Sequence, residues 1–399
     1  MAYSKELLDP PPEIIQRETP VRAALRRHES VSSKPCNREL SEPELFVFIA
    51  VSAILFVAAG NALGNWHSLV SNYGDNSAYV EVAKAIQSWD FKNLPVQHFM
   101  GYPYLIAATS FILHVPISFA LCLVAWTASL ATVFLVARLL GTWTAAYFAL
   151  SNFAWLQRSF LGGSEPLALA LGLGAFWFFR RGSIVRAGLL ASLAVTVRPL
   201  MVFALAGIGC VLLYRKQFRA FAATFATGLG IGVLYMLPLA YYLGDPLLTV
   251  HTYTTRDYGA ANIRGPHGHL FGWPFHGIVA GTMAYPSPWT NLLLSFSWIL
   301  LVLLGIGAMF SRNFRRYFKA YPAEGIFCSL YLVPLFCYDY LVWARGSFMR
   351  FSIPVLPFLF YALLEWLPKN RRILWLLSIV SPILAACSAI GVRNLQSLH

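Results

Sequence analysis

The hydrophobic pattern of the chain consists of long apolar runs separated by short polar segments. The first run, 45–63, has 19 residues and no charge, which suits a helix crossing the ~30 Å hydrocarbon core of a bilayer. Several later runs are shorter than a full span of about 17–25 residues, and Arg198-Pro199 is expected to bend one stretch into a hairpin. These runs lie at approximately 102–114, 117–137, 143–156, 166–179, 187–197, 199–214, 220–243, 291–310, 326–343, 351–364 and 373–391. The pattern predicts an all-α, polytopic membrane helix bundle of about 10–12 transmembrane helices.

The two ends of the chain differ from its middle. Residues 1–44 are polar and contain a proline run, which is typical of a disordered tail. By the positive-inside rule this tail is cytoplasmic, because basic residues shortly precede the first apolar run, namely Arg26, Arg27, Lys34 and Arg38. We therefore expect a cytoplasmic disordered tail at 1–44, a transmembrane domain at 45–391 and a short outer tail at 392–399.

Composition and charge narrow the class of protein. Hydrophobic residues make up 58% of the 399 residues and charged residues 12%, against about 45–50% and about 25% in soluble proteins. This excludes a soluble enzyme, a coiled coil and a disordered protein. The net charge of +13 does not indicate nucleic-acid binding, because the basic residues are dispersed between apolar runs. The six cysteines show no Cys-x-x-Cys spacing, so neither a zinc site nor a disulfide framework is indicated.

The charged residues sort between the two faces of the predicted membrane domain. Most of its Lys and Arg residues fit a cytoplasmic face, in clusters near 138, 180–186, 215–219, 312–319 and 369–372. Most acidic residues beyond the tail fall on or near the opposite face, together with isolated arginines: Asp75, Glu81, Asp90, Glu165, Asp245, Asp257 and Asp339. An outer face with both carboxylates and isolated arginines indicates a functional site there.

A polar loop at 65–101 follows the first predicted span and is unusually long for a helix connection. Some of its apolar residues are spaced as on one face of a helix: Tyr79, Val82, Ala83, Ile86 and Trp89. The loop is therefore expected to be ordered and to carry an amphipathic helix on the membrane surface.

Two carboxylates stand at predicted helix starts on the outer side. Asp75 precedes the surface helix, where it could cap the helix N-terminus or act as a carboxylate that takes a proton or holds a metal. Glu165 follows Gly162, Gly163 and Ser164. It could be an ordinary first-turn acid, or it could bind a ligand hydroxyl beside glycines that allow close backbone approach. Both interpretations stay open for each residue.

Isolated outer arginines are candidate anion-binding residues. Arg198 lies beside a helix-breaking proline at membrane depth, where an arginine is costly without a partner. Arg345 and Arg350 bracket an outer turn, and a guanidinium group can bind a phosphate with two parallel hydrogen bonds. All three could instead be interfacial anchors that extend to the membrane surface.

The outer loop 244–289 contributes further candidates. It holds Arg256 and His267 among several aromatic and histidine residues, a composition typical of a loop that lines a sugar or covers a site. His267 and His269 could be read as a metal pair, but no third ligand follows at a telling spacing.

Taken in order, these segments resemble the GT-C superfamily of multi-pass glycosyltransferases, which use sugars carried on polyprenyl phosphates. Members have an early catalytic Asp in a long first outer loop, followed by Tyr and Ala on a surface helix, and later short motifs. The matching residues here are Asp75, Tyr79 and Ala83, then His98 before Gly101-Tyr102-Pro103, Glu165, Thr196 with Arg198-Pro199, and Arg350-Phe351 with Pro354 and Pro357. The chain departs from the pattern where Asn76, and not a second acid, follows Asp75.

The resemblance implies a GT-C-like bundle whose catalytic residues are Asp75 and Glu165. Asp75 would be the base, Glu165 would orient the acceptor or the donor sugar, and Arg198 and Arg350 would hold the phosphate. The substrate-binding residues expected overall are Tyr79, His98, Tyr102, Arg198, Arg256, His267, Arg345 and Arg350. A divalent cation, Mg²⁺ or Mn²⁺, would have Asp75 as its ligand, but no cofactor is firmly indicated.

The function expected is transfer of a sugar, a hexose such as mannose, from a polyprenyl phosphate to a lipid, glycan or protein acceptor. Direct displacement would invert the anomeric centre. The reaction would take place on the non-cytoplasmic face of a cell inner membrane or endoplasmic reticulum membrane. Two alternatives stay open, a transporter or flippase for lipid-linked glycans and a protein similar to O-antigen polymerases.

Overall fold

The computed structural model describes residues 39–64, 66–94, 98–255, 271–284, 289–339 and 347–396. The chain divides into two units, Met1–Glu39 and Leu40–His399, and the second is described below. Three of the predicted binding residues lie outside the described residues, together with most of the expected N-terminal tail: Arg256, His267 and Arg345.

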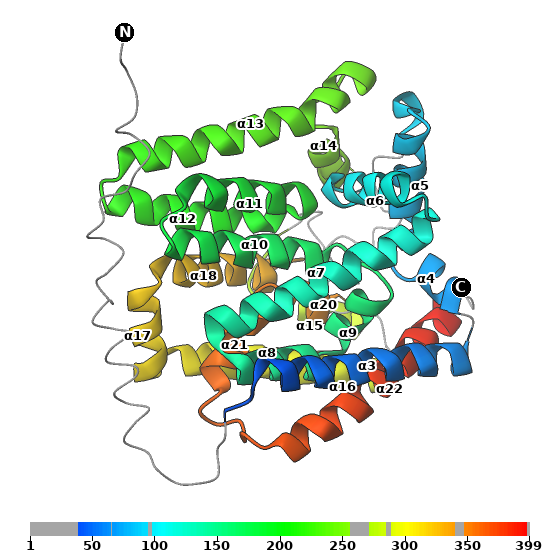
Figure 1. Cartoon of the computed structure of the whole chain (residues 1–399), viewed down its shortest axis with the longest axis vertical. Coiled ribbons are helices and arrows are strands. Elements are labelled where there is room, and N and C mark those ends of the chain that lie inside the picture. The colour runs from blue at the N-terminus through cyan, green and yellow to red at the C-terminus, as the bar shows by residue number, and fades with distance from the viewer. Residues whose placement is uncertain are drawn as a thin grey trace. The chain divides into compact units, whose positions relative to one another are not determined.

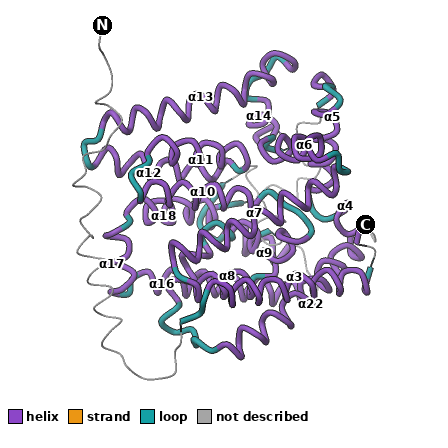
Figure 2. Tube along the Cα trace, viewed as in Figure 1, coloured by secondary structure: helices purple, strands orange, loops and turns teal. Residues whose placement is uncertain are grey.

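The described part of the second unit is built from α-helices joined by short connections (Figure 2). After α3 (Glu42–Leu63) come α4 (Trp66–Asn72), α5 (Asn76–Gln87), η1 (Phe91–Asn93), α6 (Gly101–Leu113), α7 (Ile117–Leu140), α8 (Thr142–Ser151), α9 (Phe153–Phe160), α10 (Glu165–Arg180), α11 (Ile184–Val197), η2 (Pro199–Met201) and α12 (Val202–Tyr214). The chain continues with α13 (Phe218–Leu243), α14 (Leu248–Thr255), α15 (His276–Ala284), α16 (Trp289–Met309), α17 (Arg312–Ala320), α18 (Pro322–Cys337), α20 (Phe348–Ser352), α21 (Leu356–Leu363) and α22 (Arg371–Gln396). The predicted all-α class is confirmed.

Helix length and composition identify candidate membrane spans among the described residues. α3, α7, α13 and α22 are each long and apolar enough to cross a bilayer. Two bent pairs of helices could each add a span, α9 with α10 at 102° and most of α16 with α17 at 78°. Four further apolar helices, α6, α11, η2 with α12, and α18, have only 10–17 residues. By length and composition the described residues thus contain four to six candidate spans, fewer than the 10–12 transmembrane helices that the sequence predicts, because several of the apolar runs form helices of only 10–17 residues.

The first helix and the last helix extend beyond their predicted boundaries. α3 begins at Glu42, before the apolar run, because Ser41 and Glu44 form a capping box. The Ser41 hydroxyl accepts from the Glu44 amide, and the Glu44 carboxylate accepts from the Ser41 amide at 3.0 Å. α22 continues to Gln396, since no helix-breaking residue stands between 392 and 396. The residues 392–396, expected in an outer tail, are therefore helical.

The long polar loop after α3 is ordered, as its sequence predicts. α5 carries the expected apolar face, with Tyr79, Val82 and Ala83 buried. Trp89 does not continue that face, because α5 ends at Gln87 and Trp89 has a left-handed φ of 57° and an exposed ring. α5 begins directly after Asp75, and its first residue, Asn76, is buried.

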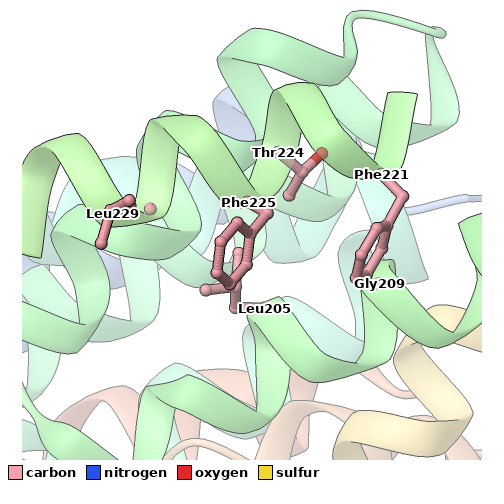
Figure 3. Close-up of a pocket in the computed structure, with 7 residues that line it drawn as sticks. Leu205, Gly209, Phe221, Thr224, Phe225 and Leu229 are labelled. Atoms are coloured by element: carbon pink, nitrogen blue, oxygen red, sulfur yellow. The ribbon is translucent and has the colours of Figure 1, made fainter. Parts of the chain in front are cut away.

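The helices α10 to α13 lie side by side in Figure 1 and alternate in direction. The predicted bend at Arg198 is confirmed, since α11 ends at Val197 and Arg198 has an extended backbone, with φ −144° and ψ 121°. α13 lies at the edge of this row and buries only Thr224 and Leu239. An apolar cavity of about 160 Å³ separates α13 from α12 (Figure 3). Most apolar side chains of α13 are exposed on the outside of the bundle, and such side chains suit contact with lipid.

Buried and half-buried charges gather at the two ends of the helices. At one end, which we call the basic end, Arg138 pairs with Glu42 at 3.2 Å and Arg371 with Glu44 at 3.0 Å. Arg180, the last residue of α10, forms the third pair there by donating from Nε and Nη2 to Glu324 at 2.7 and 2.6 Å. Glu165, the first residue of α10, lies at the opposite end, so the sequence-based separation of charges holds along this helix.

The short helix α17 lies across the basic end and is strongly amphipathic. Phe314 and Tyr317 are buried, while the basic side chains point outward: Arg312, Arg315, Arg316 and Lys319. The Tyr317 hydroxyl donates to Glu324 at 2.8 Å. This is the geometry of a helix at a membrane surface, with its apolar side toward the bundle and its cations toward headgroups.

Candidate functional site

The turn at 162–164, just before α10, packs closely against neighbouring helices. This close packing places Glu165, the first residue of α10, inside the bundle. Gly162 has a φ of 108°, which only glycine adopts readily, and a Cβ there would lie 2.0 Å from Leu121. The Gly163 amide donates to the hydroxyl of Tyr102 at 3.3 Å, and that hydroxyl donates to the Leu121 carbonyl at 3.1 Å. Tyr102 is fully buried. The structure therefore gives this predicted binding residue a positioning role beneath the turn.

Asp75 does not cap α5, although it occupies the N-cap position. Its side chain makes no capping hydrogen bond. Its Oδ2 instead lies 2.5 Å from Nη2 of Arg350, and its Oδ1 lies 3.8 Å from Nε2 of His98. The structure thus does not support the capping interpretation, and the carboxylate of Asp75 faces charged partners.

The electrostatic surroundings keep Asp75 ionised. Burial opposes the charge, but Arg350, Arg158 and His98 together outweigh it and hold the pKa of Asp75 well below its ordinary value of 3.8. At neutral pH Asp75 is therefore a carboxylate that can accept a hydrogen bond or a proton.

Glu165 is completely buried and faces two guanidinium groups. Its Oε1 contacts both Nε of Arg350 and Nη1 of Arg198. Its Oε2 has no hydrogen-bond partner in the described part of the chain. A buried carboxylate oxygen without a partner is costly, so Oε2 is available for a donor that a ligand would bring.

Arg350 joins the two carboxylates, since it contacts Asp75 and Glu165 at once. It lies on the short helix α20, far from both in sequence. Arg198 enters from the break between α11 and η2, and its guanidinium lies 5.8 Å from the ring centre of Phe351. The site thus joins four separate segments of the chain at the end of the bundle opposite the basic end.

Asn76 explains how Asp75 and Glu165 come together. Its buried side-chain amide donates to the Val70 carbonyl at 2.7 Å and to the Leu161 carbonyl at 2.9 Å. These bonds tie the start of α5 to the turn before α10. Asn76 therefore has a structural role that its identity as a polar residue after Asp75 does not indicate.

Aromatic rings line one side of the carboxylates. The ring of Tyr79 lies 5.2 Å from that of His98 and 5.1 Å from that of Tyr102, and its hydroxyl lies 3.1 Å from the Ser164 hydroxyl. Tyr79 and His98 were both expected to bind substrate. The structure places them next to Asp75 and Glu165, so six of the described site residues come together: Asp75, Tyr79, His98, Glu165, Arg198 and Arg350.

A seventh site residue, Arg158, was not among the predicted ones. It lies on α9, is only 7% exposed, and acts electrostatically on both Asp75 and Glu165. A signal for it existed in the sequence, because an arginine within an apolar region by default indicates a functional site. Arg158 stands four residues before Gly162 in a short amphipathic stretch.

The described residues of the site do not offer the set of ligands that a divalent metal ion takes. Within the described ranges no three His, Cys, Asp or Glu side chains gather as a metal site would require. Asp75 is the one residue expected to be a ligand, and its carboxylate already faces Arg350 and His98. His267 and His269, the residues that could be read as a metal pair, lie outside the described residues.

In the described ranges, two other acid–histidine pairs lie away from this site. His276 and Asp339 are joined at 2.7 Å, and Asp339 is buried, where α15 meets the end of α18. His251 and Asp245 are also joined at 2.7 Å, but in an exposed position. The apolar cavity shown in Figure 3 is lined by residues of α12 and α13 and holds no charged group among its lining residues.

Comparison with solved structures finds ArnT from Cupriavidus metallidurans. The apo structure has a TM-score of 0.48 and 14% sequence identity, and the alignment covers 79% of this chain and 60% of ArnT. The structure bound to undecaprenyl phosphate has a TM-score of 0.40 and 17% identity, with the same coverage. The chain thus spans about three fifths of the length of ArnT. No protein-family profile and no curated protein sequence matches the chain.

Proposed function

We propose that this protein is a membrane glycosyltransferase that moves a sugar from a polyprenyl phosphate to an acceptor hydroxyl. The observation that carries the proposal is the pairing of two carboxylates with arginines in one buried site. Asp75 and Glu165 share Arg350, and Arg198 and Arg158 lie beside them. Glycosyl transfer from a phosphate needs both a base and cations, and the site supplies both.

Asp75 is the residue suited to accept the proton of the acceptor. Its lowered pKa keeps it ionised, and it is less deeply buried than Glu165, with 27% of its side chain exposed. The acceptor oxygen would attack the anomeric carbon while its proton passes to Asp75. The bond between that carbon and the phosphate oxygen breaks, and the electron pair leaves with the polyprenyl phosphate. Such a direct displacement inverts the anomeric centre.

The arginines are suited to stabilise the leaving phosphate. The leaving group gains negative charge as the bond breaks, and cations fixed in a buried site stabilise such charge without having to reorganise. Glu165 holds two of these guanidinium groups. Its free Oε2 can accept a hydrogen bond from a hydroxyl of the donor sugar or of the acceptor. We propose a hexose as the sugar, in particular mannose.

The orientation follows from the charge distribution. Basic side chains at the basic end are exposed or pair at the surface of the bundle, on α7, α13, α17 and α22 and between α12 and α13, among them Arg138, Arg215, Lys216, Arg219, Arg312, Arg315, Arg316, Lys319, Arg371 and Arg372. By the positive-inside rule this end faces the cytoplasm. We therefore propose that the N-terminus is cytoplasmic and that the site opens on the other side of the membrane.

The alternative of a transporter or flippase makes a different use of the same residues. It would bind an anionic lipid-linked glycan at the arginines and move it, without breaking the bond to phosphate. A transporter pathway needs polar groups along the middle of the bundle. In the described residues of α10, Glu165 and Arg180 stand at its two ends, and the 14 residues between them carry no charge. This observation favours an enzyme.

The test is sugar transfer by purified protein in lipid nanodiscs with a panel of polyprenyl-phosphate sugars, following release of the lipid phosphate. Replacing Asp75 by Asn keeps the shape of the side chain and removes its basicity. We expect transfer to fall by about 10²–10⁴-fold while the protein stays folded. Transfer near the wild-type level in this variant would refute the base assignment, and lipid movement without phosphate release would support the transporter. If Asp75→Asn keeps the activity and substitutions in the outer loop that carries Arg345 abolish it, the protein is similar to O-antigen polymerases.

A further inference from the structure

Arg158 and Arg198 each have a buried Nη1 that makes no hydrogen bond to the described residues, but Nη1 of Arg198 contacts the Glu165 carboxylate, whereas no carboxylate of the described residues is paired with Arg158. Arg158 is only 7% exposed. Its Nη1 is buried without a hydrogen-bond partner in the described ranges. Burying a guanidinium donor without a partner is costly, so a fold that maintains it indicates a ligand atom that completes it.

The guanidinium of Arg158 is held in place on two sides. It lies 4.6 Å from the centre of the Tyr73 ring, a cation–π contact, and the Tyr73 hydroxyl donates to Gln157 at 2.7 Å. The backbone of Gly74 covers it closely, because a Cβ at Gly74 would lie 2.8 Å from both Nη1 and Nη2. Gly74 also has a φ of 56°, which suits glycine. The side chain is therefore fixed before any ligand arrives.

The charges of the site favour an anion beside Arg158. Arg350 and Arg198 are engaged by the carboxylates of Asp75 and Glu165. No ion pair of that kind joins Arg158 to a carboxylate among the described residues. Three guanidinium groups against two carboxylates leave one positive charge in a buried place, which a bound anion would compensate.

A donor and an acceptor without partners flank the same glycine. A Cβ at Gly163 would lie 2.6 Å from Cδ of Arg158 and 2.7 Å from Oε2 of Glu165. The unpaired Nη1 of Arg158 and the unpaired Oε2 of Glu165 belong to these two side chains. A ligand with a phosphate oxygen next to a sugar hydroxyl presents the acceptor and the donor that these atoms lack.

We propose that Arg158 binds the phosphate of the polyprenyl-phosphate sugar and keeps hold of it as the leaving group. This inference rests on the proposed glycosyl transfer and names the phosphate-binding residue of that site. Arg198 and Arg350 contribute positive charge to the site but already contact the two carboxylates, so Arg158 makes the direct contact with the phosphate. The phosphate binds the guanidinium of Arg158, for which the described residues provide no carboxylate partner.

The experiment measures binding of undecaprenyl phosphate and of undecaprenol, which has the same chain without the phosphate, to purified protein in nanodiscs. We expect Arg158→Gln to weaken binding of the phosphate about 10–100-fold, the effect of losing a charged hydrogen bond, and to leave undecaprenol binding unchanged. The matched control is Arg138→Gln at the basic end, where the arginine is half exposed and pairs with Glu42. It should bind both lipids as the wild type does.

The outcomes separate this inference from the proposed function. Equal binding of both lipids by the wild type would overturn the proposed function itself. Phosphate-dependent binding in the wild type that Arg158→Gln leaves unchanged would overturn only the role of Arg158. If Arg158→Gln fails to fold, Arg158→Lys takes its place. Lys keeps the charge without the planar fork, so we expect an intermediate loss that undecaprenol does not share, and unchanged binding would again refute the role.

Discussion

Replacing Glu165 by Gln tests whether its buried ion pairs serve the site or only the fold. The substitution keeps the shape of the side chain and removes one negative charge from between Arg198 and Arg350. Each pair is worth about 4 kcal/mol in gross Coulomb energy at an effective dielectric of about 20. Arg350 keeps Asp75 as a partner, so one guanidinium, that of Arg198, is left uncompensated. Breaking a buried pair in this way costs about 3–5 kcal/mol.

The chain provides a matched control at the basic end. Glu324 is also buried, and Arg180 donates two hydrogen bonds to it. Glu324→Gln should therefore reduce the free energy of unfolding by a similar amount. Stability of both variants can be measured by unfolding in mixed detergent micelles of rising SDS content, and transfer can be measured on the folded fraction alone.

The two variants should differ in activity and agree in stability. We expect folded Glu324→Gln protein to transfer sugar at the wild-type rate and folded Glu165→Gln protein to lose most transfer. If the folded fraction of Glu165→Gln is fully active, Glu165 is a structural residue. If Glu165→Gln costs no stability, the ion pairs with Arg198 and Arg350 do not form as described.

Two further predictions concern the neighbourhood of Asp75. Asn76→Ala removes the hydrogen bonds to the Val70 and Leu161 carbonyls. It should lower stability by about 1–3 kcal/mol and also reduce transfer, because Asp75 loses its placement; a variant with lower stability but full transfer per folded molecule would contradict this. For pH, the pKa of Asp75 is lowered on folding, so its stabilising effect is fully present above its ordinary pKa and is lost as the pH falls through the lowered value. The stability difference between wild type and Asp75→Asn should thus stay constant from about pH 8 to about pH 4, and a decline already between about pH 7 and pH 5 would show that Arg350 does not lower this pKa.

The sequence was informative where the chemistry of a residue conflicts with its surroundings. Asp75, Glu165, Arg198 and Arg350 are charged groups at the borders of apolar runs, and such groups are rare there without a function. The structure brings these four together. The helical spacing from Tyr79 to Ala83 likewise predicted α5, because an amphipathic face has a period that can be read directly.

Contacts between distant segments could not be predicted in the same way. Asn76 looks like an ordinary polar residue after Asp75, and its hydrogen bonds to the Val70 and Leu161 carbonyls depend on the packing of α5 against the turn before α10. Tyr102 was expected to touch substrate, but its hydroxyl is used by Gly163 and Leu121. Short helices such as α9 and α20 also have too few residues for a clear period.

Helix α10 is anchored by ions at both extremities. It has 16 residues, so its axis is about 24 Å long. Glu165 ties its first turn to Arg198 and Arg350, and Arg180 ties its last turn to Glu324. Moving α10 along or around its axis would break the ion pairs at both of its ends. A bulky lipid that enters the protein must therefore displace other parts, and α13, which is held by few buried side chains, is the element best able to yield.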